Sequence, residues 1–382
     1  SRVAPPTERR HRQAMADWQS ALDRARGHSP FLSQALDKQP DLAALLQSGD
    51  GEAALAMAAQ AGSDADDVGT ALRREKLALA TALAVGDLAG AFPLERVMAA
   101  LSHFADRALD AAIADGIARR APDAQPAGFV ALALGKHGAQ ELNYSSDIDP
   151  ILLYDPETLP RRPRDEPAEA ANRIARHVVQ MLGTVTAEGY VFRVDLRLRP
   201  QAEITPLAVP VGGALSHYES SALTWERAAF LRARVAAGDR ELGADFLGAI
   251  DPFIWRSSLD FGAVQEIRRL SARIRSEYGG PPQPGPGYDL KRGRGGIREA
   301  EFFVQTLQLI HGGRYPALRV RGLHAALVAL VAEELLDERE AAIIAASYDT
   351  LREAEHRVQM IHDRQTHEIP AGEALDNAAR LA

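Results

Sequence analysis

With 382 residues, the chain is long enough for two or three domains with an ample buried core, and its 46% hydrophobic and 25% charged content is that of an ordinary soluble protein. The formal net charge of −8 argues against general nucleic-acid binding, which depends on clustered Lys and Arg side chains that release counterions. Cysteine is absent, which excludes disulfides and thiolate zinc sites and is compatible with the cytoplasmic location that we expect.

We expect no membrane partner. The longest uninterrupted apolar run, Ala325 to Ala332, is far too short to span a bilayer, and the first residues lack the apolar region of a signal peptide. The chain ends inside a helix-like pattern, ALDNAARLA. This ending suggests a fragment of a longer protein.

Residues 1–120 are predicted to form an N-terminal helical region. Pro30, Pro40 and the stretch 62–67 separate short helices, and a long amphipathic helix follows over 93–120. No group of potential ligand residues stands out in the first 90 residues. We therefore interpret this region as a packing unit.

Residues 121–240 are predicted to form a core with a mixed sheet covered by helices. Short apolar runs from Phe129 to Leu134 and from Ile148 to Tyr154 are typical of buried strands. An exposed proline-rich loop is expected over 155–168, a helix over 169–187 and a third strand within 190–200. The predicted fold class is thus α+β, mostly helical.

Residues 222–239 carry apolar and arginine side chains at helical spacing, with Trp225 as a packing anchor. Residues 241–382 are then predicted to form a C-terminal helical bundle. Its helices are expected at 261–277, 297–312, about 321–335 and 338–363.

Three aspartates suggest a site for phosphoryl or nucleotidyl transfer. Asp147 and Asp149 lie two apart at the start of a predicted strand, so both face one side, where their repulsion is relieved by cations. Asp195 follows on the next predicted strand, among arginines. Such a group of carboxylates favours a site for two Mg²⁺ ions. The alternative is a solvated turn at a strand end, which is the commoner meaning of an isolated Asp-x-Asp.

The stretch 281–299 is rich in glycine and proline, which break any regular element before a predicted helix. Gly295 and Gly296 precede that helix, and Lys291, Arg292 and Arg294 lie beside them. Backbone N–H groups and cations in this arrangement can hold a phosphate. The alternative is a flexible hinge between domains with solvated charges.

The string GKHGAQELNYSSDID (135–149) resembles the nucleotidyltransferases of the polymerase-beta type. In particular it resembles the bacterial glutamine synthetase adenylyltransferase/adenylyl-removing enzymes. Three further blocks in the same order share this resemblance: FRVDLRLRP (192–200), WERAAFLRARVAAGD (225–239) and GRGGIREAEFFVQ (293–305). His137, Pro150, Arg292 and Arg294 depart from the family pattern.

The resemblance implies that Asp147, Asp149 and Asp195 are catalytic and hold Mg²⁺. It also implies a set of phosphate- or nucleotide-binding residues: Gly135, Lys136, Gly138, Ser145, Ser146, Arg193, Arg197, Arg199, Lys291, Arg294, Gly295 and Gly296.

Family members carry one domain that adds AMP to a tyrosine of glutamine synthetase and one that removes it. The segments 251–270 and RQTHEIP (364–370) resemble the removing half. The expected reaction is Mg²⁺-dependent phosphorolysis, in which inorganic phosphate releases the AMP group as ADP. The expected partners are glutamine synthetase, these nucleotides and, in the full-length enzyme, a PII-type signal protein.

Two alternatives stay open. One is the forward adenylylation with ATP. The other is a non-enzymatic helical regulatory module with an inactive core, against which the three retained carboxylates argue.

Overall fold

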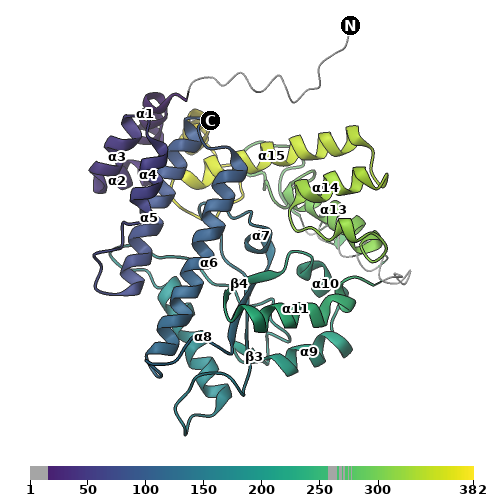
Figure 1. The fold of residues 1–382 in the computed structure, drawn as a ribbon. Helices are drawn as coiled ribbons and strands as arrows, with labels where there is room; N and C mark the ends of the chain where they lie inside the picture. Colours follow the sequence, from purple (N-terminus) through teal and green to yellow (C-terminus); the bar gives the residue numbers. More distant parts are fainter. Residues whose placement is uncertain (1–15, 257–264, 266–268, 270–271, 274, 277) are drawn as a thin grey trace.

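The computed structural model describes residues 16–256, 265, 269, 272–273, 275–276 and 278–382 (Figure 1). Most of the helix predicted at 261–277 lies outside these residues, as does much of the segment 251–270. No helix in the described part of the chain is long and apolar enough to cross a membrane.

The N-terminal region is helical, as predicted. Four short helices precede two long ones, and side chains of Asp17, Ser29, Asp50 and Asp67 cap the first turns of α1, α2, α4 and α5. The helices are α1 (Trp18–His28), α2 (Pro30–Lys38), α3 (Pro40–Gln47), α4 (Gly51–Ala58), α5 (Val68–Leu88) and α6 (Leu94–Ala118).

The sheet is small, mixed and buried on both faces. Its order is β3-β2-β1-β4, with β1 antiparallel to both β2 and β4 and with β2 parallel to β3. The strands are β1 (Phe129–Ala133), β2 (Pro150–Tyr154), β3 (Ala208–Pro210) and β4 (Arg234–Gly238). This arrangement confirms the predicted α+β nucleotidyltransferase-like fold.

Helices cover each face of the sheet. Phe129, Ala131 and Leu152 pack with α5, α6 and α8 (Pro167–Gly183) in one core. Val130 and Leu132 face the other core, formed with α9 (Val211–Ser220), α10 (Thr224–Phe230) and α11 (Arg240–Ile254). Alternate residues of β1 therefore serve opposite cores, which explains its uninterrupted apolar sequence.

The C-terminal part forms a separate helical cluster and then returns to the N-terminal helices. The elements are α13 (Ile297–His311), the 3₁₀ turn η2 (Pro316–Leu318), α14 (Leu323–Ala332), α15 (Glu338–Met360) and α16 (Glu373–Leu381). The long helix α15 runs from this cluster toward α5, and α16 packs on α1 (Figure 1). The predicted domain limits at 120 and 240 stay a prediction.

Two predicted elements are wrong. Residues 190–200 form no strand: Val194 makes a single parallel bridge to Ile148, and the backbone turns at Asp195, whose carboxylate accepts a hydrogen bond from the Arg197 N–H at 2.9 Å. The helix expected through 222–239 ends at Phe230, because the following residues pair with β1 as strand β4.

Candidate active site

The three predicted aspartates line one cavity at the end of the sheet where β1 stops and β2 starts. Ala133 pairs with Pro150 there, so Gly135 and Asp149 meet at the same edge. Asp195 joins them because its N–H donates to the Ile148 carbonyl at 2.9 Å. The cavity has a volume of about 680 Å³. Its lining includes Gly135, Lys136, Ser146, Asp147, Asp149, Asp195, Arg197, Trp225, Arg232, Lys291, Arg298, Glu301, Phe302, Gln365 and His367.

Position 135 requires glycine for two reasons, its backbone conformation and the closeness of the Asp149 carboxylate. Its φ of +57° lies in the left-handed region, which side chains disfavour. A Cβ atom at this position would lie 2.8 Å from Oδ2 of Asp149. The glycine thus leaves the carboxylate open to the cavity.

The carboxylates repel one another. Burial, together with the charges of Asp195 and Asp147, raises the pKa of Asp149 to about 6, whereas Lys291 and Arg197 oppose the shift. This mutual repulsion is what a bound cation would relieve.

Arginines neutralise the two outer aspartates. Asp147 accepts hydrogen bonds from Arg193 Nε at 2.6 Å and from Gln365 Nε2 at 2.7 Å. Asp195 is paired with Arg197 through both carboxylate oxygens. The Arg197 side chain is 86% exposed, so its ion pair with Asp195 contributes little to stability. Little free energy is therefore lost when Arg197 moves away from Asp195.

The residues fit Mg²⁺ once Arg197 moves aside. In the part of the chain that the structure describes, no three acidic or histidine side chains are already grouped as a metal site. Asp195 is instead paired with Arg197, and Asp147 accepts hydrogen bonds from Arg193 and Gln365. The repulsion at Asp149 and the open space beside Gly135 nevertheless match hard oxygen ligands for a divalent cation.

Cations line the same cavity as the aspartates. Lys136 contacts both carboxylate oxygens of Glu355 at 2.9 Å. Burial lowers the pKa of Lys136 to about 8, with Arg352 and Lys291 contributing and Glu355 opposing. Burial raises the pKa of Glu355, but Lys136, His367 and Arg352 outweigh it and hold that pKa well below its usual range.

Several predicted binding residues do not line the cavity. Gly138 packs against the backbone of Arg232, and Ser145 is buried. Arg193 donates a hydrogen bond to Asp147 and does not line the cavity. Arg199 donates to the carbonyl oxygens of its own turn: Leu196, Ala202, Thr205 and Pro206.

The predicted phosphate cradle at 291–296 is only partly present. The N–H of Gly295 donates to Glu299 Oε2 and that of Gly296 to the Gly293 carbonyl, so neither is free for an anion. Arg294 is also absent from the cavity lining, whereas Lys291 belongs to it. The loop therefore supplies one lysine instead of a nest of backbone donors.

Sequence reasoning missed the residues that reach the cavity from distant parts of the chain. Gln365 and His367 arrive from the segment after α15, where the string RQTHEIP was the only signal. Nδ1 of His367 faces Glu355. Arg298 comes from α13, and Arg232 pairs with Glu301 at 2.9 Å.

Trp225 is not the packing anchor predicted for it. Its side chain lines the cavity and the residue is 39% exposed, so it presents an aromatic surface to a ligand. His137 is in contrast structural, since it is buried and contacts Asp106 at 2.7 Å. Pro150 occupies the first position of β2, where proline is tolerated.

Comparison with known proteins agrees with this geometry. Residues 17–249 match the family model of glutamate-ammonia ligase adenylyltransferase, and residues 268–382 match that of the GlnD PII-uridylyltransferase.

Curated relatives bear the name bifunctional glutamine synthetase adenylyltransferase/adenylyl-removing enzyme. The one from Caulobacter vibrioides is 46% identical over 332 residues, which are 83% of this chain and 34% of that protein. The one from Xanthobacter autotrophicus is 42% identical over 372 residues, 92% of this chain and 38% of that protein. The chain thus spans about a third of the length of these relatives. By its family match and by the nucleotidyltransferase-like core that holds the three aspartates, the chain belongs to the glutamate-ammonia ligase adenylyltransferase family.

Proposed function

We propose that the chain removes AMP from the adenylylated tyrosine of glutamine synthetase by Mg²⁺-dependent phosphorolysis. The observation that carries the proposal is one cavity lined both by the three aspartates and by Lys136, Lys291 and Arg298. Attack of one anion on another needs such opposed charges, because cations must offset the repulsion between phosphate and the AMP group. The resemblance of 364–370 to the removing half supports this direction.

In the proposed reaction, an oxygen of inorganic phosphate bonds to the α-phosphorus while the bond from phosphorus to the tyrosine oxygen breaks. The phosphate becomes the β-phosphate of ADP, and the phenolate takes up a proton. Asp147, Asp149 and Asp195 would hold Mg²⁺, which when bound withdraws charge from the phosphoryl oxygens. A phenol, with a pKa of about 10, leaves more readily than an aliphatic alcohol.

The cationic side would bind the attacking phosphate. Lys291 and Arg298 supply charge, and Lys136 is oriented by Glu355. Glu355 also contacts His367 Nδ1, which fixes the ring and leaves Nε2 for a substrate oxygen. Glu355 of α15 and His367 of the segment after it would thus position the attacking phosphate.

The adenine ring would lie against Trp225 and Phe302, the two aromatic side chains of the cavity. A partly exposed indole offers a flat apolar face, and stacking on such a face is worth about 1–3 kcal/mol per base. This contact would distinguish a nucleotide from free phosphate.

The experiment incubates the chain with adenylylated glutamine synthetase and Mg²⁺, with and without inorganic phosphate. We expect ADP and unmodified tyrosine only when phosphate is present. Arsenate should replace phosphate and yield AMP, because the arsenate product hydrolyses. Asp149→Asn is the control, since it keeps the shape and removes a metal-binding charge; its turnover should fall roughly a hundredfold or more.

The same assay distinguishes the alternatives. Labelling of unmodified glutamine synthetase from ATP, with release of pyrophosphate, would mean that the chain performs the forward reaction. The names of the relatives include both activities. A properly folded chain with neither reaction would be a regulatory module.

We further propose a PII-type signal protein as a partner of the longer protein. The support is the match of 268–382 to a PII-uridylyltransferase family model. Titration of the chain with a PII protein, followed by light scattering, should detect a complex. No complex with the chain or with the longer protein would contradict the proposal.

A further inference from the structure

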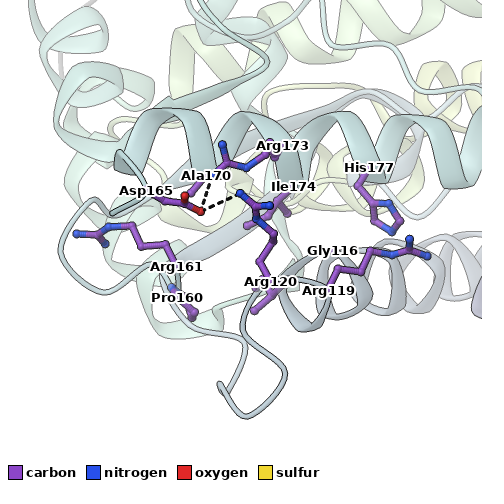
Figure 2. Close-up of a pocket in the computed structure, with 11 residues that line it drawn as sticks. Gly116, Arg119, Arg120, Pro160, Arg161, Asp165, Ala170, Arg173, Ile174 and His177 are labelled. Carbon is purple, nitrogen blue, oxygen red and sulfur yellow. Dashed lines mark hydrogen bonds and ion pairs between the residues drawn. The ribbon is translucent and has the colours of Figure 1, made fainter. Parts of the chain in front are cut away.

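A second cavity lies beside α6 and α8, and it shares no residue with the first. It is formed by the end of α6, the first half of α8 and the loop that precedes α8 (Figure 2). Its volume is about 170 Å³.

Arginine dominates the lining. The charged side chains of the cavity are Arg119, Arg120, Arg161 and Arg173, against a single carboxylate, Asp165. Ile117, Ala170 and Ile174 are buried and form its apolar floor. Arg119 is paired with Asp115 at 2.8 Å, and Arg161 donates to the carbonyl oxygens of its own loop. Arg120 and Arg173 are the two arginines that bond Asp165, and Arg173 also lies 3.6 Å from the exposed Glu169. Two guanidinium groups directed at one position favour an anion there.

Asp165 occupies the centre of this cation group. Its Oδ2 accepts hydrogen bonds from Arg173 at 2.6 Å and from Arg120 at 3.3 Å, as the dashed lines in Figure 2 show. Two guanidinium groups therefore share one oxygen of one carboxylate. Their Nε atoms are buried and have no hydrogen-bond partner within the described chain. A buried donor without an acceptor costs free energy, which a ligand that supplies the acceptor would recover.

The loop that carries Asp165 can release it. Asp165 belongs to the proline-rich stretch 155–166, between β2 and α8, and the Asp165 N–H makes a local hydrogen bond to Arg162. The side chain is partly exposed, so its exchange for another anion needs no opening of the core. Asp165 is thus placed as an internal competitor for whatever anion the arginines bind.

The volume limits the ligand to a small group. At roughly 30 Å³ per water molecule, the cavity holds about five or six waters, which is the room that a tetrahedral oxyanion needs. Two guanidinium forks suit the several oxygens of a doubly charged phosphate better than the two of a single carboxylate.

We propose that this cavity is a second anion site, distinct from the catalytic one, which binds a phosphate group in place of Asp165 between Arg120 and Arg173. The ligand is inorganic phosphate or the phosphate of a small monoester.

The test measures binding to the 382-residue chain by calorimetry in metal-free buffer, with inorganic phosphate, glycerol 3-phosphate and succinate as probes. Every protein carries Lys291→Gln, which weakens phosphate binding in the catalytic cavity. In this background we expect both phosphate probes to bind and succinate to bind at least tenfold more weakly.

Variants then locate the site. Arg120→Gln with Arg173→Gln should weaken phosphate binding at least tenfold, whereas Asp165→Asn should tighten it severalfold by removing the competitor. Arg176→Gln, on the exposed face of α8 and outside the cavity, is the matched control and should change nothing. Circular dichroism confirms that each variant is folded.

The two substitutions act in opposite directions, so loss of folding cannot imitate the expected pattern. Unchanged phosphate affinity in the double arginine variant would overturn the proposal. Weaker phosphate binding in Asp165→Asn would also overturn it, because the carboxylate would then support the binding site instead of competing with phosphate for the arginines. Tighter binding of succinate than of phosphate would refute the ligand class.

Discussion

At the scale of single residues, Asp149 is the most informative group, because its position costs stability. Its folded pKa of about 6 exceeds the unfolded value of about 3.9, so between these values the folded chain binds the additional proton. Stability therefore falls as pH rises from about 4 to about 6, and the full penalty, about 1–3 kcal/mol after allowance for partial exposure, is present at neutral pH.

Asp149→Asn removes this penalty, so in EDTA we expect a higher melting temperature than for the unmodified chain at about pH 7.5 and no difference near pH 4. Asp66→Asn, in the exposed turn before α5, is the control and should alter neither value. A melting temperature of Asp149→Asn that is lower at neutral pH would show that the carboxylate is stabilised rather than strained.

Trp225 gives a second prediction at this scale. If adenine stacks on it, Trp225→Ala should weaken ADP binding by about 1–3 kcal/mol, roughly tenfold or more, while Trp225→Phe loses less. Isothermal titration measures the affinity directly. Trp255→Phe, a tryptophan outside the cavity lining, should leave ADP binding unchanged. Equal ADP affinity in Trp225→Ala would remove this residue from the nucleotide site.

At the scale of elements, α15 holds the loop that leads into the Asp147–Asp149 motif. Arg352 is fully buried and donates to the Glu141 carbonyl at 2.6 Å, to the Tyr348 hydroxyl at 2.6 Å and to Asn143 Oδ1. Its loss leaves the buried Glu141 carbonyl without this donor and removes a cation 3.3 Å from the buried Glu355, which keeps Lys136 and His367. We expect Arg352→Met to destabilise the chain by about 3–5 kcal/mol in urea unfolding.

Arg339→Met is the matched control, since it lies on the same helix but is exposed, and it should cost less than about 1 kcal/mol. A similar small cost for Arg352→Met would show that the buried network does not anchor α15.

The elements that could be predicted from sequence are those whose pattern is local. The stripe of α6, the apolar runs of β1 and β2 and the capped start of α15 at Asp337 all depend on near neighbours. One failure depends on a distant partner, because residues 234–238 become a strand only where β1 offers an edge. The other is local: the chain turns at Asp195 because its carboxylate accepts a hydrogen bond from the Arg197 N–H.

At the scale of the whole molecule, the cavity is completed by segments that lie far apart in sequence. Gln365 reaches Asp147, and Glu355 joins Lys136 to His367, because α15 crosses from the C-terminal cluster to α5 (Figure 1). There His356 and Arg357 contact Asp87 at 3.2 and 2.8 Å. The aspartates could be proposed from their spacing together with the motif around them, whereas no local pattern indicates which distant lysine or histidine lines the same cavity.

The central claim is that inorganic phosphate is the nucleophile that removes AMP. The most direct measurement supplies radiolabelled inorganic phosphate to the chain with adenylylated glutamine synthetase and Mg²⁺, and then locates the label in the nucleotide product. The account predicts label in the β-phosphate of ADP, in proportion to the tyrosine released. Unlabelled AMP as the product, or label in no nucleotide while tyrosine is released, would contradict it.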